Sequence, residues 1–204
     1  MATNERSTVA AGTIGGAEER DGRRLRSHDS RKRIVQAMLE LVRDGDVSPG
    51  AEQVATRAKV GLRTVFRHFK DMDSLYAEMA HAIEAEFRDV LDQPFVAADW
   101  RGRVIEIIGR RSRVFERIGP FRRASEVHRH RSPFLDAGNA RLISTAREIL
   151  KGQLPPDVAG DAVTFEALDL LLSFESWSRL RRDQNLDPAA ARAVLEGAVR
   201  KLIA

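Results

Sequence analysis

The sequence predicts an all-α protein with an N-terminal three-helix domain that contains a helix-turn-helix, and a larger C-terminal helical domain. Residues 51–76 place small, apolar and basic residues in the order that a helix-turn-helix requires. Apolar residues recur at helical spacing through the rest of the chain, and Pro or Gly separates the segments. No convincing strand pattern and no repeat of fixed period is visible, so helices are expected throughout.

Composition narrows the class of protein. The 204 residues suffice for a small domain and a larger one. The absence of cysteine excludes a disulfide framework, a thiol nucleophile and a cysteine-ligated zinc ion. No apolar run reaches the roughly 18 residues of a membrane helix, and no apolar signal-peptide core is present. We therefore expect a cytoplasmic protein without a membrane partner.

Positive charge is concentrated near the N-terminus. Residues 1–70 carry 14 Lys and Arg against 9 Asp and Glu, a net charge of +5, whereas the whole chain carries +4. Residues 1–27 lack apolar periodicity, which predicts a disordered basic arm. Its end could follow DNA into a minor groove, or it could be a solvated charge run. The basic residues concerned are Arg23, Arg24, Arg26, Arg31, Lys32 and Arg33.

Residues 28–73 form the predicted DNA-binding domain. A first helix is expected from Asp29 or Ser30 to Arg43, with Ser48-Pro49 as the start signal of the second. The second helix should end near Ala58 and the recognition helix should begin near Gly61. Their shared core is expected to contain Val54, Ala58, Val60, Val65 and Phe69, with Ala55 where the helices cross.

The exposed side of the recognition helix supplies the candidate DNA contacts. Arg63 can bond bidentately to a guanine edge or hold phosphate. Thr64 suits a phosphate or a thymine methyl group, and Leu62 could touch such a methyl or be a partly exposed apolar residue. The other basic residues would meet backbone phosphates. The full predicted set is Leu62, Arg63, Thr64, Phe66, Arg67, His68 and Lys70.

The stretch from about Arg31 to Tyr76, ending in TVFRHFKDMDSLY, resembles the DNA-binding domain of the TetR family of transcriptional regulators. The resemblance implies a homodimer that binds a roughly palindromic double-stranded operator, with a C-terminal domain that dimerises and binds a small-molecule effector. It implies no cofactor. A repressor released by its effector is the function that follows.

Four positions depart from the TetR pattern. Lys59 replaces a turn glycine and would have to adopt a left-handed conformation at a cost of roughly 1 kcal/mol. Gly61 replaces the usual Ser or Thr at the helix start, which is tolerable in an N-cap. Phe66 lacks the hydroxyl of a phosphate-contacting Tyr, so its ring can only pack. Met72 stands where a phosphate-contacting Lys is common.

Residues 74–204 form the predicted dimerisation and effector domain. A long helix should span residues 71–91 and connect the two domains without interruption after the recognition helix. The following helices are expected at 99–118, 120–131, 133–152, 160–182 and 187–203. The last two have features of a dimer interface, or of an internal core seam. These features are an apolar face (Leu170, Leu171, Phe174, Trp177) and small residues at every fourth position (Ala189, Ala193, Gly197).

Two charged residues interrupt apolar faces and mark a candidate effector pocket. Arg111 and Glu175 would be costly to bury unpaired, so they line a wet cavity or are paired structural residues. Phe115 would be a neighbouring wall residue, and the aliphatic surroundings favour an apolar or amphipathic effector. The arginine-rich stretch at 122–131 is either a solvated face or an anion contact for an effector.

No metal or catalytic site is expected. His128 and His130 would point to different sides of a helix, among arginines that repel cations. Neither a phosphate loop, a nucleophile elbow nor a dinucleotide turn is present, so we expect no enzymatic activity. The alternatives to a regulator are a helical interaction protein whose helix-turn-helix serves protein contacts and, third, an all-helical enzyme.

Overall fold

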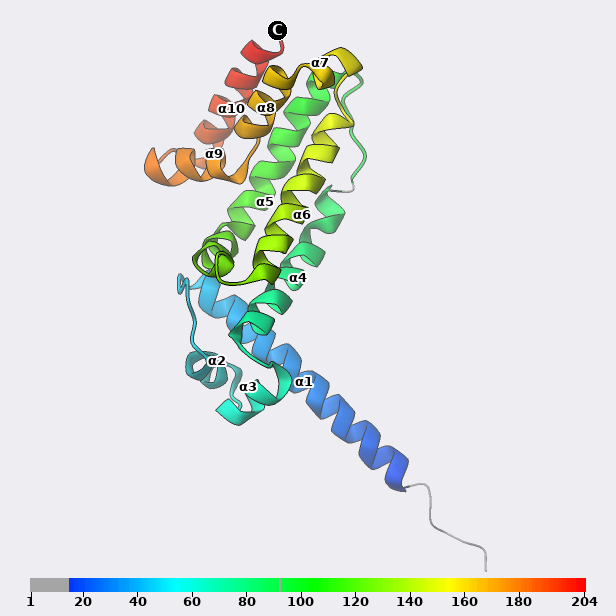
Figure 1. Ribbon diagram of the computed structural model, residues 1–204, viewed down its shortest axis with the longest axis vertical. Helices are drawn as coiled ribbons and strands as arrows, with labels where there is room; N and C mark the ends of the chain where they lie inside the picture. Colours follow the sequence, from blue (N-terminus) through cyan, green and yellow to red (C-terminus); the bar gives the residue numbers. More distant parts are fainter. Residues whose placement is uncertain (1–14, 92) are drawn as a thin grey trace, which may run out of the picture.

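The computed structural model describes residues 15–91 and 93–204, with side chains from residue 24 onward except at positions 86–89 and 91. The regular structure in these ranges is entirely helical, which confirms the predicted all-α fold (Figure 1). None of these helices is long and apolar enough to cross a membrane. The helices are α1 (Gly15–Arg43), α2 (Ala51–Ala58), α3 (Leu62–His68), α4 (Met72–Leu91), α5 (Trp100–Arg129), α6 (Pro133–Lys151), α7 (Pro156–Gly160), α8 (Ala162–Leu171), α9 (Phe174–Ser178), the π-helix η1 (Arg179–Asp183) and α10 (Pro188–Leu202).

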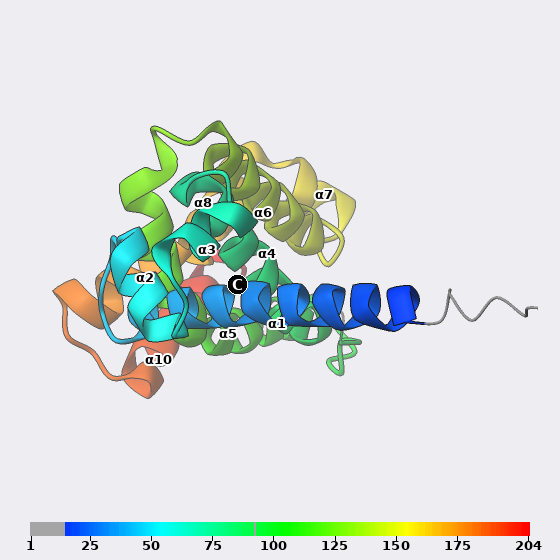
Figure 2. The same cartoon turned by 90° about the horizontal axis from the view of Figure 1, so that it is seen from below.

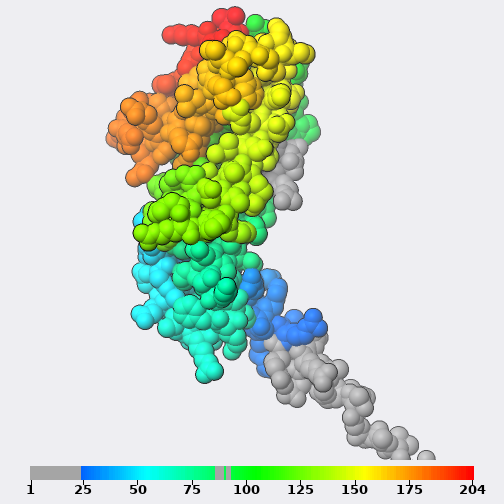
Figure 3. All heavy atoms as spheres, in the orientation of Figure 1, coloured from blue at the N-terminus to red at the C-terminus, as the bar shows by residue number. Residues whose placement is uncertain are grey.

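The molecule is elongated, with the helix-turn-helix at one end (Figures 1 and 3). Helices α2 and α3 lie beside α1 at the lower end, while α7, α8 and α10 lie at the opposite end (Figure 1). Helix α4 starts next to α3 and runs alongside α5 and α6, with which it makes extensive contacts. It therefore connects the helix-turn-helix mechanically to the rest of the protein.

Two hydrophobic clusters hold the fold together. The first joins α1–α4 to the C-terminal half of α5 and the start of α6, through Phe121, Ala124 and Leu135. The second lies at the other end, between the first half of α5, the end of α6, α8 and α10. The first core thus extends across the predicted domain boundary near residue 73. The helix-turn-helix end and the lower end of the helical body share one buried core.

Helix α1 begins 14 residues earlier than the first expected helix start, Asp29. The prediction of a disordered arm is therefore wrong for residues 15–27, while residues 1–14 lie outside the described part. Residues 24–29 are exposed, so burial does not hold them in place. Adding a residue to an existing helix is far easier than nucleating one, and Arg, Glu and Leu are good helix formers. The buried second half of α1 supplies the nucleus (Figure 1).

The start of α2 also differs from the prediction. Ser48-Pro49 does not cap the helix, because α2 begins at Ala51 with Gly50 as its N-cap. The side chain of Gln53 performs the capping: its Oε1 accepts a hydrogen bond from the Gly50 N–H at 2.7 Å, and its Nε2 donates to Asp46 at 2.9 Å. A glutamine three residues into the helix thus determined the boundary.

Helix α5 continues through Gly119-Pro120, where the sequence predicted a break between two helices. Proline removes one backbone hydrogen bond and bends a helix, but the residues on both sides are buried in the first core. Packing of Val114, Phe121 and Ala124 therefore holds the two halves in one helix. Its final turns point in a different direction from the rest (Figures 1 and 2).

The predicted helix over 160–182 is divided into α8, α9 and η1. In an uninterrupted helix the Leu172 carbonyl would accept from the Ser176 N–H. Instead, Arg111 Nη1 donates to the Leu172 carbonyl at 3.0 Å, and the Ser176 N–H donates to the Ser173 hydroxyl at 3.1 Å. An arginine from α5 and a serine cap therefore end one helix and start the next.

This division also overturns the predicted single apolar face. Trp177 is only 2% exposed and belongs to the second core, whereas Leu170 is 65% exposed. The four residues of that predicted face do not share one side of a helix, because α8 and α9 are separate. The small residues of α10 do lie outside: Ala189 and Ala193 are exposed and Gly197 is half-buried.

Candidate DNA-binding surface

The turn between α2 and α3 has the predicted geometry. Lys59 has φ 54° and ψ 48°, the left-handed conformation expected of a non-glycine residue there. The Val60 N–H donates to the Ala55 carbonyl at 3.0 Å, and the Lys59 N–H donates to the Thr56 carbonyl at 3.1 Å. These bonds satisfy carbonyls that the end of α2 leaves free and offset the cost of the conformation.

The apolar side of the helix-turn-helix is buried as expected. Val54, Ala58, Val65 and Phe69 are nearly inaccessible, and Val60 packs against them. The second helix and the recognition helix therefore meet through small and branched side chains. This packing holds the opposite side of α3 outward (Figure 2).

Helix α3 ends at His68, and the chain leaves the helical conformation before α4. Phe69 has an extended backbone, φ −130° and ψ 124°, and α4 begins at Met72. The predicted uninterrupted connection from α3 to α4 is therefore wrong. Burial of the Phe69 ring in the first core requires the chain to turn inward here, because a further helical turn would follow the axis of α3.

The outer side of α3 faces away from the core. Arg63, Arg67 and Lys70 are exposed, and within the described residues they make no hydrogen bond or ion pair. Leu62 and Phe66 expose 39% and 48% of their surfaces beside the N-terminal end of α2. The Phe66 ring thus does not pack into the core. Both basic and apolar groups are available to an external surface.

Two residues of the predicted contact set are less accessible. Thr64 and His68 are half-buried, and the Nε2 atom of His68 is covered without a hydrogen-bond partner. Burial lowers the pKa of His68, and the neighbouring positive charges of Arg67 and Arg31 lower it further. His68 is therefore predominantly neutral at pH 7, unlike the basic residues beside it.

Arg31 has a structural role that the sequence did not reveal. Its guanidinium donates to the His68 carbonyl and to the Glu78 carboxylate, both at 2.9 Å. It also lies 4.4 Å from the centroid of the Phe69 ring. One side chain of α1 thus joins the end of α3 to α4. Periodicity could not detect this, because the partners are 37 and 47 residues away.

The three candidate effector residues make different contacts around the junction of α8 and α9. Arg111 is buried and donates to the carbonyls of Leu172 and, at 2.6 Å, Ala146. Glu175 has a side chain that is 69% exposed and pairs with Arg122 at 3.2 Å. Phe115 packs edge-on against Phe174. For Arg111 these contacts favour the paired structural residue among the two interpretations.

The junction between the helix-turn-helix end and the helical body contains a histidine in contact with a tyrosine ring. The His128 ring on α5 lies 4.4 Å from the Tyr76 ring on α4, measured between centroids. Burial lowers the pKa of His128; His130 and Arg131 lower it further, and Asp73 opposes them. The described residues include no group of three side chains able to hold a metal ion.

This junction should be sensitive to acid. Because His128 and His68 have lower pKa values in the folded protein than in the unfolded chain, the unfolded chain binds more protons near pH 6. The contribution of these two histidines to the free energy of unfolding is fully present above their unfolded pKa of about 6.5. It is lost as the pH falls below that value. We expect the thermal midpoint to drop between about pH 7.5 and about pH 5.5. His128→Gln should reduce this drop, and an unchanged pH profile in that variant would contradict the assignment.

The tight turn between α2 and α3, the exposed side of α3 and the helical body together define a helix-turn-helix protein. Comparison with solved structures specifies the fold further: it is that of TetR transcriptional regulators. A TetR transcriptional regulator from Rhodococcus sp. RHA1 aligns with a TM-score of 0.54 at 15% identity, over 85% of this chain and 94% of the other.

Two further structures have the same fold. A transcriptional regulator from Rhodococcus sp. RHA1 aligns with a TM-score of 0.65 at 18% identity, over 85% of this chain and 95% of its own. The multidrug binding protein EbrR, solved in complex with ethidium, aligns with a TM-score of 0.57 at 21% identity, over 83% of this chain and 98% of its own. No family model and no curated protein matches the sequence.

Proposed function

We propose that this protein is a sequence-specific regulator of transcription that binds a double-stranded operator through α3 and acts as a repressor. The observation that carries the proposal is the outer side of α3, where Arg63, Arg67 and Lys70 are exposed and make no hydrogen bond or ion pair with the residues that the structure describes. Unpaired basic groups beside exposed apolar ones suit a phosphate-lined groove with base edges at its floor. The TetR-like fold supports this proposal.

The contacts divide by position on α3. Arg63, in the first turn, is placed to read a base edge, with Leu62 and Phe66 offering apolar contact. Arg67 and Lys70, at the other end, would hold phosphates and set the orientation. His68 is half-buried and mainly neutral, so it would contribute by packing at the end of α3 more than by its charge.

A homodimer would present two recognition helices to a palindromic operator. Exposed apolar residues on α8 and α10 support an interface at the end opposite α3: Val163, Leu170 and Val194. Ala189, Ala193 and Gly197 follow one another at every fourth position on α10, and a Cβ at Gly197 would meet no atom within 4 Å. Small residues let helices of two subunits approach closely.

Release by a small effector is the regulatory part of the proposal. EbrR, whose fold is similar, is a multidrug binding protein. A ligand that moves α4 would change the separation of the two recognition helices, since α4 joins α3 to α5 and α6. Operator half-sites one turn apart tolerate little change in that separation.

Arg63→Ala tests base reading directly. We expect the variant to lose about 1–3 kcal/mol of binding free energy at the preferred operator and to relax preference at one position in each half-site. Binding sites would be selected from a random DNA pool by both proteins, and affinities measured at one fixed salt concentration.

Arg141→Gln, at an exposed position on α6, is the matched control for loss of one positive charge. Equal weakening of Arg63→Ala on operator and random DNA would show that Arg63 holds only phosphate. If the wild-type protein enriches no sequence at all, the proposed function is wrong.

A further inference from the structure

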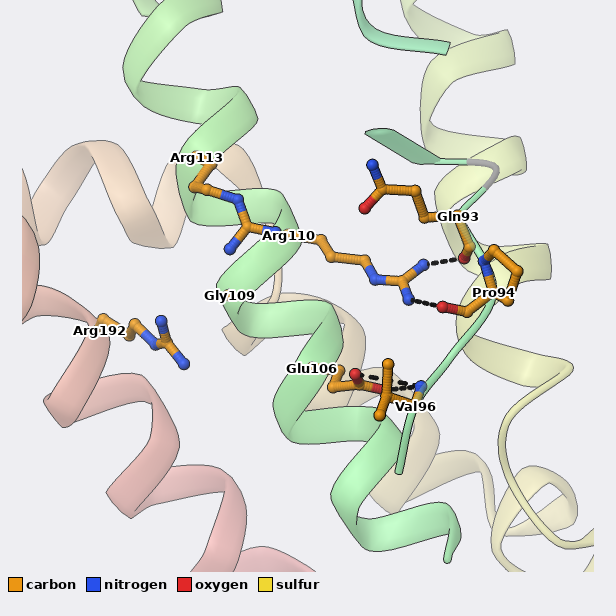
Figure 4. A pocket seen from close by; sticks show the side chains of 8 residues that line it. All are labelled: Gln93, Pro94, Val96, Glu106, Gly109, Arg110, Arg113 and Arg192. Carbon is orange, nitrogen blue, oxygen red and sulfur yellow. Dashed lines mark hydrogen bonds between the residues drawn. The ribbon is translucent and has the colours of Figure 1, made fainter. Parts of the chain in front are cut away.

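A cavity of about 200 Å³ lies between α5, the N-terminal half of α10 and the segment 93–97 that follows α4 (Figure 4). Three arginines line it: Arg110, Arg113 and Arg192. None of them belongs to the predicted DNA contacts or to the predicted effector pocket. Such a concentration of guanidinium groups around one cavity requires an explanation, because like charges repel.

Arg110 forms one wall and is held in place by the segment 93–97. Its guanidinium donates to the carbonyls of Gln93 and Pro94 and lies 4.0 Å from the centroid of the Phe95 ring. These partners are neutral, so they orient the side chain without cancelling its charge. Arg110 is also buried, which increases the influence of that charge on the cavity.

Glu106 holds the same segment from below. Its carboxylate accepts hydrogen bonds from the N–H groups of Val96 at 3.0 Å and Ala97 at 3.2 Å (Figure 4). Glu106 and Arg110 therefore attach the segment to α5 from one helix face. The wall that they form is ordered by these contacts and does not need a ligand to assemble.

Arg113 and Arg192 supply the donors that remain available. Arg113 is exposed and makes no hydrogen bond or ion pair within the described residues. Arg192 uses its Nε to bind Glu196 at 2.6 Å, and its terminal nitrogens lie over Gly109. A Cβ at Gly109 would come within 3.2 Å of that guanidinium, so the glycine makes room for it. Figure 4 shows Arg192 reaching from α10 toward Gly109.

We propose that this cavity binds a small organic carboxylate. The three guanidinium groups outnumber the carboxylates of Glu106 and Glu196 by one, so an anion would complete the charge balance. Guanidinium donors match a planar carboxylate in paired hydrogen bonds. The volume is below the roughly 300 Å³ where pockets for drug-sized ligands begin, which restricts the ligand to a small acid.

The site does not depend on DNA binding, so the full-length protein alone tests it. Acetate, benzoate, succinate and inorganic phosphate would each be titrated calorimetrically. We expect saturable binding of at least one carboxylate, weakened about tenfold or more in both Arg113→Gln and Arg192→Gln, because each removes a charged hydrogen-bond donor. Gly109→Ala should also weaken it by displacing the Arg192 guanidinium.

Arg141→Gln, on α6 outside the cavity lining, removes the same charge and should bind as the wild type does. Circular dichroism would verify that every variant is folded. The proposal fails if no carboxylate binds at concentrations up to about 10 mM. It also fails if Arg141→Gln weakens binding equally, or if phosphate binds more tightly than every carboxylate.

Discussion

Val65→Asp should unfold the helix-turn-helix end of the protein. Val65 is 1% exposed, at the contact between α3 and the rest of the first core. A carboxylate there would be buried without a partner, which costs several kcal/mol and disrupts the part of the first core that holds α2 and α3 in place. Operator binding should be lost, together with part of the helical circular dichroism signal.

The second core should outlast this substitution. Its residues lie at the far end of the molecule and include none from α1–α4. Thermal unfolding of Val65→Asp should therefore retain a transition from that end, and its oligomeric state should be that of the wild type. Val65→Ala is the matched control, with a loss of about 1–3 kcal/mol and measurable operator binding. Wild-type affinity in Val65→Asp would mean that α3 is packed differently.

Arg111→Ala should destabilise the helical body by about 2–5 kcal/mol. The substitution removes the guanidinium donor from the carbonyls of Ala146 and Leu172 and opens a cavity around the missing side chain. Burial lowers the pKa of Arg111 to about 10, so the group is still charged at pH 7, and both hydrogen bonds are charge-assisted. Chemical denaturation of both proteins at one fixed protein concentration would measure the difference in their free energies of unfolding.

Arg111→Met separates the hydrogen bonds from the packing, since methionine keeps much of the volume without donating. We expect it to recover part of the stability but not all. A different result would assign Arg111 to the effector: unchanged stability in Arg111→Ala, combined with weaker binding of an identified effector. That outcome would contradict the structural assignment made from its contacts.

The helix-turn-helix could be predicted from the sequence because its determinants are local. The spacing of Val54, Ala58 and Val65 depends only on helix geometry, and the turn places Lys59 in the one conformation that joins the two helices. Which residues of α3 face outward follows from the same periodicity. Arg63 and Lys70 could thus be identified as exposed before any tertiary contact was known.

Contacts between distant residues determined the rest. The division of the 160–182 segment depends on Arg111, 61 residues from the carbonyl that it binds. Continuity of α5 through Pro120 depends on a core shared with α1, α4 and α6, and the place of Arg31 depends on partners in α3 and α4. Helix propensity and capping act over about one turn, whereas burial and ion pairing act between segments that only the folded chain brings together. The sequence by itself therefore determined the turn and the buried side of the helix-turn-helix, and tertiary packing decided where the helices of the body begin, bend and stop.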